Sequence, residues 1–135
     1  MQSLLQMLST KGPFALLILR VVTGVILAVH GYQKATMYGW GIGFFHSLGI
    51  PLAQVVGPVV TVLEIGGGVL LILGLFVRLL GLVFTIEFIV AFLLMLSSKG
   101  LAGRELEALM LVASLVLATE GAGAISLGRA RGLGV

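Results

Sequence analysis

The sequence has no cysteine and no aspartate, and only 10% of its 135 residues are charged. Without thiols the chain cannot form a disulfide, a thiolate metal site or a cysteine-ligated iron–sulfur cluster. Its two histidines, His30 and His46, fall near one predicted membrane face, so they cannot hold a haem across a bilayer. No glycine-rich dinucleotide loop follows a predicted strand. We therefore predict no metal site, no covalently bound cofactor and no electron-transfer centre within the chain.

The sequence is rich in hydrophobic residues and glycine. Hydrophobic residues make up 59% of the chain, which also has 20 glycines, and the mean hydropathy is +1.23. A soluble domain of this size could not cover so much apolar surface, whereas glycine suits close helix packing in lipid. The net charge of +3 comes from cations that lie mostly at the ends of apolar runs, a pattern typical of membrane anchoring and not of nucleic-acid binding. The sequence predicts an all-α integral membrane protein of the cell (inner) membrane, in contact with the lipid bilayer.

Four apolar runs are long enough to cross a bilayer, which takes roughly 20 helical residues. They cover about 13–31, 51–76, 79–96 and 104–125. We expect a single transmembrane domain over residues 1–135, folded as a four-helix bundle. The small excess of cations in the loops on one side favours both termini in the cytoplasm. Four short spans seldom enclose a wide aqueous path, so we also expect a homo-oligomer or a complex with another membrane protein.

The connection between the first two runs is rich in aromatic residues. It extends from Tyr32 to Ile50 and includes Tyr38 and Trp40. Amphipathic aromatic rings favour the membrane–water interface. This segment is predicted to form a cap at one interface, with a short helix from Gly41 to Leu48. An ordinary interfacial loop is the alternative interpretation.

Glu64 is the only charged residue in the run from Pro51 to Phe76. A carboxylate at the centre of a bilayer is costly unless it is paired, hydrated or protonated, so it marks a candidate functional site. Polar and small residues follow 3/4 spacing in the first, second and fourth runs, which predicts stripes that face the inside of the bundle. The candidate residues of this intramembrane polar network or ligand site are Arg20, His30, Lys34, Glu64, Glu87 and Glu107.

Depth along the helices predicts two polar centres. Arg20 and Glu64 are expected to form a deep one, and His30, Lys34 and Glu107 an outer one. Glu87 leaves two arrangements open, because it lies about 200° around its helix from Thr85. Either the Gly81–Thr85 face packs on a neighbour and Glu87 points inward, or the reverse holds. Each charge also has a structural interpretation, with Arg20 neutralising a glutamate and Lys34 and Glu107 serving as interface anchors.

The order of these residues resembles a known pattern. Arg20-Val-Val-Thr-Gly followed by His30-Gly-Tyr-Gln-Lys34, then Glu64-Ile-Gly-Gly-Gly and Gly74-Leu-Phe-Val-Arg78, resembles the signature of the DoxX family. Glu107 with the later Gly121-Ala-Gly123 and Ser126-Leu127 resembles its closing segment, except that Gly128 stands where an aspartate is usual. The resemblance implies a four-helix membrane protein whose relatives include subunits of thiosulfate:quinone oxidoreductases and members of oxidoreductase complexes in oxidative-stress defence.

Two classes of function follow from these observations. The first is a membrane subunit of a redox system that handles a quinone or a similar lipophilic molecule. In it, Glu64 or His30 would exchange protons, and Arg20 and Lys34 would hold a quinone oxygen or an anionic substrate. The second is non-enzymatic: a small transporter, a lipid-binding module or an assembly factor with a proton-coupling or structural Glu/Arg network. Electrons for the first would come from a diffusible quinone or a partner protein.

Overall fold

The computed structural model describes residues 1–99 and 104–132, and all the regular structure in those residues is helical. The helices run in the order α1 (Gln2–Ser9), α2 (Gly12–Met37), α3 (Ile42–Ser47), α4 (Ala53–Leu73), α5 (Val77–Lys99), α6 (Glu105–Glu120) and α7 (Leu127–Arg131). The ends of the long helices carry the expected signals. Pro13 lies in the first turn of α2, and Gly74 ends α4 with a φ of 75°, which glycine adopts without strain.

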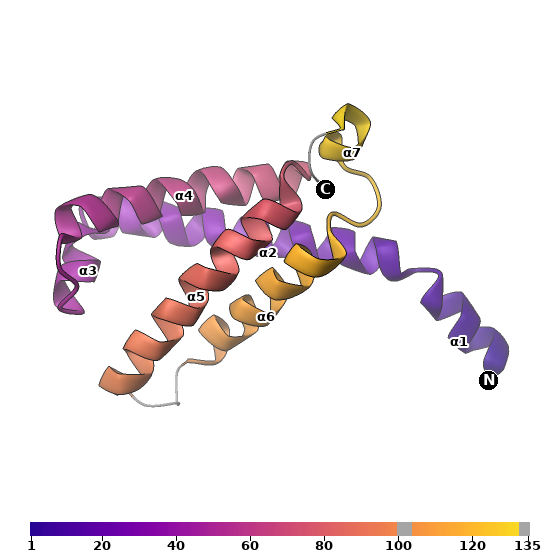
Figure 1. The fold of residues 1–135 in the computed structure, drawn as a ribbon, viewed down its shortest axis with the longest axis horizontal. Helices are drawn as coiled ribbons and strands as arrows, with labels where there is room; N and C mark the ends of the chain where they lie inside the picture. Colours follow the sequence, from indigo (N-terminus) through magenta and orange to yellow (C-terminus); the bar gives the residue numbers. More distant parts are fainter. Residues whose placement is uncertain (100–103, 133–135) are drawn as a thin grey trace.

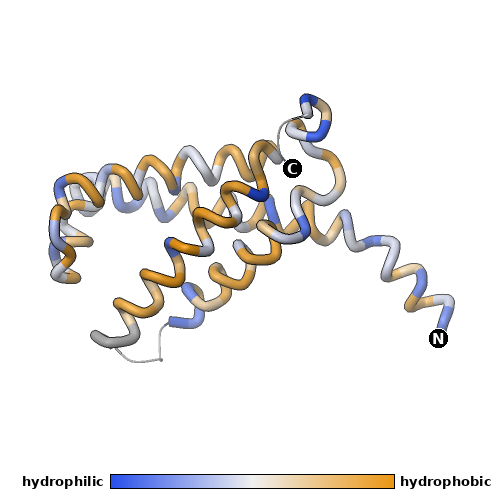
Figure 2. The backbone as a smooth tube through the Cα atoms, viewed as in Figure 1, coloured by the Kyte–Doolittle hydropathy of each residue, from blue (hydrophilic) through white to orange (hydrophobic). Residues whose placement is uncertain are grey.

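Within residues 1–99 and 104–132, three helices are long and apolar enough to cross a membrane: α2, α4 and α5, the last over Val77–Met95. The fourth predicted span is shorter than its apolar run. α6 has 16 residues, or about 24 Å of helix at 1.5 Å per residue, and the chain leaves the helix at Gly121. The large apolar side chains on the outer faces of these helices are widely exposed, as expected for surfaces that meet lipid. Figure 2 shows the same apolar character along the helix bodies.

The long helices are arranged as two closely packed pairs, α2 with α4 and α5 with α6 (Figure 1). In each pair a glycine brings the two backbones together. A Cβ atom on Gly68 would lie 2.5 Å from the carbonyl oxygen of Gly24, and one on Gly81 would lie 2.5 Å from the amide nitrogen of Ala118. No side chain fits at such distances, so the small residues set the packing of both pairs.

The two pairs meet at one end and diverge toward the other (Figure 1). At the closed end Arg20, which is only 2% exposed, donates from Nη1 to the carbonyl oxygen of Ala122 at 2.8 Å and from Nη2 to that of Ile125 at 3.0 Å. Ser126 Oγ donates to the carbonyl oxygen of Gly74 at 3.0 Å. We call these five residues the Arg20 clasp. It ties the segment after α6 to α2 and to the end of α4.

The predicted pairing of Arg20 with Glu64 is therefore wrong. The prediction placed the end of the fourth span at residue 125 and used depth along the helices to put Glu64 within reach of the long Arg20 side chain. Instead α6 ends at Glu120, and Gly121 and Gly123 turn the chain with φ values of 85° and 75°. The carbonyl oxygens of Ala122 and Ile125 are then available to the guanidinium, which binds them and not a carboxylate.

Candidate functional site

A cavity of about 560 Å³ lies between the diverging helix pairs, with α3 along its edge. Its walls are mostly aliphatic and come chiefly from α4 and α5. They include Val56, Val60 and Leu63 on one side and Val83, Ile86 and Val90 on the other. The divergence of the two pairs leaves this space between them. Its size and apolar lining are typical of small-molecule sites in proteins.

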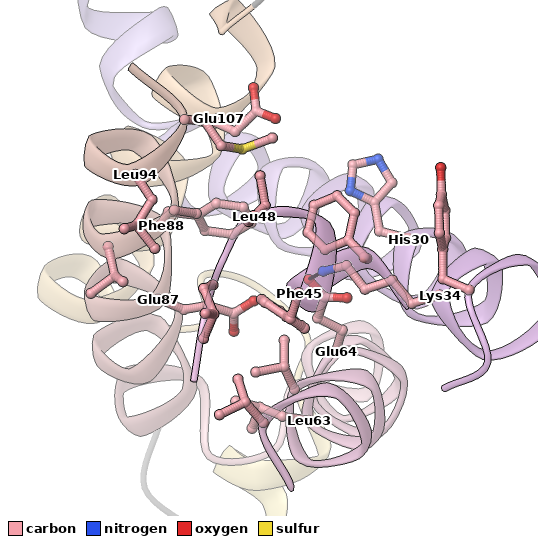
Figure 3. Close-up of a pocket in the computed structure, with 18 of the residues that line it drawn as sticks. His30, Lys34, Phe45, Leu48, Leu63, Glu64, Glu87, Phe88, Leu94 and Glu107 are labelled. Atoms are coloured by element: carbon pink, nitrogen blue, oxygen red, sulfur yellow. Dashed lines mark hydrogen bonds and ion pairs between the residues drawn. The ribbon is translucent and has the colours of Figure 1, made fainter. Parts of the chain in front are cut away.

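Lys34 and Glu64 form an ion pair in this cavity (Figure 3). Lys34 Nζ lies 2.7 Å from Glu64 Oε1, and the side chains are 16% and 3% exposed. Glu64 faces inward because its helix packs on α2 through Gly68 on the same stripe. Lys34 extends from the last turns of α2, and its Nζ lies 5.2 Å and 5.5 Å from the ring centres of Phe44 and Phe45 on α3. The ammonium is thus held by a carboxylate and two aromatic faces.

Glu87 enters the cavity from α5, and its carboxyl group faces that of Glu64 (Figure 3), within reach of a shared proton. The first of the two predicted arrangements is confirmed, since Gly81 and the buried Thr85 lie on the face that packs away from the cavity, with Gly81 against α6. As carboxylates, Glu64 and Glu87 each leave one buried oxygen, Oε2, with no hydrogen-bond partner. Two facing acids and one ammonium therefore share the centre of the cavity.

Glu107 and His30 line the same cavity. Glu107 comes from the first turn of α6, where Arg104 Nη1 lies 3.8 Å from its Oε1. Arg104 is only 6% exposed and also donates to Met95 Sδ at 3.2 Å. The predicted fourth span begins at Arg104, and the structure makes this residue a buried neighbour of the site. Glu107 Oε2 is a further buried acceptor without a partner.

The aromatic segment lies beside this site. Tyr38 lines the cavity and meets Phe44 edge-to-face, with ring centres 5.7 Å apart. Thr61 Oγ1 donates to the carbonyl oxygen of Trp40 at 3.1 Å, which ties the segment to α4. The helix predicted from Gly41 to Leu48 is present as α3. Tyr32 and Trp40 are 65% and 51% exposed, and their placement at a membrane interface stays a prediction.

The structure brings five of the six predicted residues into one cavity and leaves Arg20 outside it. The two predicted polar centres are thus replaced by one, lined by His30, Lys34, Glu64, Glu87 and Glu107. Sequence reasoning did not assign Phe44 and Phe45 to the site. The signal was present, because two aromatic residues in a short predicted helix follow Lys34 closely enough to fold back over it.

The charges define what the cavity can bind. Three carboxyl groups and the ammonium of Lys34 face it, with Arg104 beside Glu107. Such a balance disfavours an anionic ligand, so the suggestion that Arg20 and Lys34 hold an anionic substrate loses its basis. No group of three or more potential ligand residues is placed to hold a metal ion within residues 1–99 and 104–132. An apolar molecule with a small polar head group matches the lining best.

Fold and site together define a helical membrane protein with a charged cavity among its spans. The family model described as DoxX matches residues 15–97, more than half of the chain. This chain belongs to the DoxX family, as its sequence pattern predicts.

Two named relatives are similar to it. "Putative oxidoreductase CatD" of Bacillus subtilis (strain 168) is 35% identical over 112 residues, which cover 82% of each chain. "Inner membrane protein YphA" of Escherichia coli (strain K12) is 29% identical over 72 residues, 53% of this chain and 51% of that protein. No solved structure gives a significant match. The second name agrees with a membrane location, and the word oxidoreductase belongs to the first relative alone.

Proposed function

We propose that this chain is a membrane subunit of an oxidoreductase system and that its cavity binds a quinone or a similar lipophilic molecule. The observation that carries the proposal is the Lys34–Glu64 pair, 2.7 Å apart, inside an otherwise aliphatic cavity of about 560 Å³. A structural ion pair needs no cavity beside it, because protein interiors are close-packed. The name of the B. subtilis relative supports the reaction class.

The apolar walls suit the ring and tail of such a molecule. Val60 and Leu63 of α4 and Ile86 and Val90 of α5 line the two sides, and both of these helices are long and apolar enough to cross a membrane. A lipophilic ligand partitions into the bilayer, so it reaches this cavity from the hydrocarbon region without crossing water. Burial of its apolar surface would supply most of the binding free energy.

The polar groups supply orientation and proton transfer. An ammonium has three N–H donors, so Lys34 can keep its bond to Glu64 and donate another to a ligand oxygen. Glu64 and Glu87 lie where a carboxyl group accepts a proton from a bound molecule or returns one. The chain has no cysteine and two histidines, so the electrons would pass to or from a partner membrane protein.

The lone tryptophan offers a direct test of binding. Trp40 is joined to α4 next to the cavity through Thr61, and quinones quench indole fluorescence on contact. Titration of decylubiquinone into the purified protein in nanodiscs is expected to give saturable quenching. Lys34→Met is expected to abolish the saturable component, whereas Lys11→Met, which removes an exposed lysine outside the cavity, leaves it intact. Linear, non-saturating quenching in all three proteins would sink the proposal and favour a non-enzymatic role.

The proposed topology places α6 in the membrane as a fourth, short span, with both termini in the cytoplasm and α3 at the opposite interface. The absence of cysteine makes this easy to test. Ser3→Cys in α1 and Ser47→Cys in α3 are both exposed and give single thiols for labelling. In intact cells an impermeant maleimide is expected to label Ser47→Cys and to spare Ser3→Cys. Labelling of both, or of Ser3→Cys alone, contradicts the topology.

A further inference from the structure

The cavity has more hydrogen-bond acceptors than donors at its centre. Glu64 Oε2 and Glu87 Oε2 are buried and have no partner as carboxylates, and Glu64 is only 2% exposed. Both groups face the same space (Figure 3). Buried acceptors are nearly always satisfied in native proteins, so two of them opposite each other need either a donor from a bound molecule or a proton that the two acids share.

The two nearby cations each already have a partner. Lys34 Nζ donates to Glu64 Oε1, and the guanidinium of Arg104 is bound to Met95 Sδ and lies beside Glu107 Oε1. A ligand carbonyl oxygen only accepts hydrogen bonds, so placing it near the two free carboxylate oxygens adds repulsion between acceptors. A ligand hydroxyl reverses that relation, since its O–H donates to a carboxylate in a strong, charge-assisted hydrogen bond.

We propose that the cavity selects the reduced, hydroxyl-bearing form of its lipophilic ligand, a hydroquinone whose O–H groups donate to Glu64 and Glu87, over the oxidised quinone. This inference rests on the proposed function and adds the redox state that the site prefers. Lys34 does not discriminate, because an ammonium donates equally well to a hydroxyl or a carbonyl oxygen. The preference therefore resides in the two acids.

A proton shared between Glu64 and Glu87 is the competing way to satisfy both oxygens. In that state the acids satisfy each other and offer a ligand no free acceptor, so the reduced and oxidised forms bind alike. The two arrangements thus predict different ratios of affinity for the same pair of molecules. Substitution of either acid by glutamine also distinguishes the two arrangements, because an amide supplies a donor where the carboxylate supplied only acceptors.

The test compares decylubiquinone with its reduced form, decylubiquinol, by calorimetric titration of the nanodisc-embedded protein under anaerobic conditions. The wild type is expected to bind the reduced form roughly tenfold or more tightly, the ratio that one hydrogen bond to a charged group supplies. Glu87→Gln is expected to keep quinone binding and lose this ratio. Glu120→Gln, which makes the same change at an exposed position outside the cavity, keeps it.

Equal affinities for the two forms, or tighter binding of the quinone, in the wild type overturn this inference and leave the proposed function standing. Failure of both forms to bind removes the proposed function itself, and the inference with it. Persistence of the full ratio in both Glu64→Gln and Glu87→Gln also overturns it, because the acids would not be its source. Circular dichroism of each variant confirms that the comparison is made between folded proteins.

Discussion

Two cations of α2, Arg20 and Lys34, are bound to different kinds of partner. Arg20 is bound to the carbonyl oxygens of Ala122 and Ile125 at the closed end of the molecule. Lys34 is bound to Glu64 in a cavity that holds further unsatisfied acceptors. A guanidinium fixed by backbone groups can only hold the chain together. An ammonium paired with a carboxylate in a largely aliphatic cavity can exchange partners, which is what binding and proton transfer require.

Replacement of the clasp cation should have the largest effect on stability. Arg20→Met removes two hydrogen bonds from a charged donor and leaves the buried carbonyl oxygen of Ala122 and the partly buried one of Ile125 unpaired, so we expect a loss of about 3–5 kcal/mol of unfolding free energy. Denaturant titration in detergent measures it. Ligand affinity of the molecules that remain folded should be unchanged. A stable Arg20→Met protein that no longer binds quinone would contradict this separation, because Arg20 would then contribute to ligand binding and not to stability.

Lys34→Met should affect both stability and binding. It leaves Glu64 buried without its partner, at a cost of roughly 3 kcal/mol for breaking a buried pair. The double variant Lys34→Met with Glu64→Leu removes both charges and should recover most of that stability. Quinone binding should stay absent in the double variant, because the polar groups that orient the ligand are gone. If the double variant recovered quinone binding as well as stability, the Lys34–Glu64 pair would have only a structural role.

Gly81→Val tests how much the close packing of α5 on α6 contributes to stability. A Cβ at this position would lie 2.5 Å from the amide nitrogen of Ala118, so α5 and α6 must move apart. Overpacking of this kind typically costs about 1–3 kcal/mol. Gly66→Val, on the same chain but with nothing within 4 Å of its Cβ, serves as the control and should lose less stability in the same thermal melt. Equal losses would show that the close approach of α5 and α6 contributes little.

Thr61→Val should have the smallest effect. It removes one hydrogen bond, from Oγ1 to the carbonyl oxygen of Trp40, worth about 1 kcal/mol. The consequence should be local, with faster amide hydrogen exchange in residues 40–47 and little change in α5 and α6. Thr36→Val removes an exposed bond within α2 and should leave the exchange of residues 40–47 unchanged. A uniform rise in exchange along the chain would instead indicate global destabilisation.

The sequence predicted the helical membrane class, the family and the charged residues that line the cavity. The 3/4 spacing of small residues correctly oriented Glu64 toward its neighbour α2, because glycine stripes mark contacts between helices. A carboxylate in the middle of an apolar run was expected to need a partner, and Glu64 is only 2% exposed and is paired with Lys34. Composition and periodicity were sufficient to predict these features, because each feature depends on the residues of a single helix.

The choice of partner for each charge could not be predicted in this way. Depth along the helices put Glu64 within reach of the long Arg20 side chain, but the contact depends on where α6 ends and how the following segment folds back. That ending is set by Gly121 and by contacts with Pro13 and Gly74 far away in the sequence. The burial of Arg104 and the approach of Phe44 and Phe45 to Lys34 likewise depend on tertiary packing.

The central claim is that the cavity beside Lys34 and Glu64, and not the outer face or the clasp, is the ligand site. Photolabelling with an azido-quinone in nanodiscs, followed by peptide mapping, tests it most directly. The account predicts labelling of cavity-lining residues such as Leu63 and Ile86, suppressed by excess decylubiquinone and absent in Lys34→Met. Labelling confined to lipid-facing residues such as Val62 and Val69, insensitive to competitor and to the variant, would contradict it.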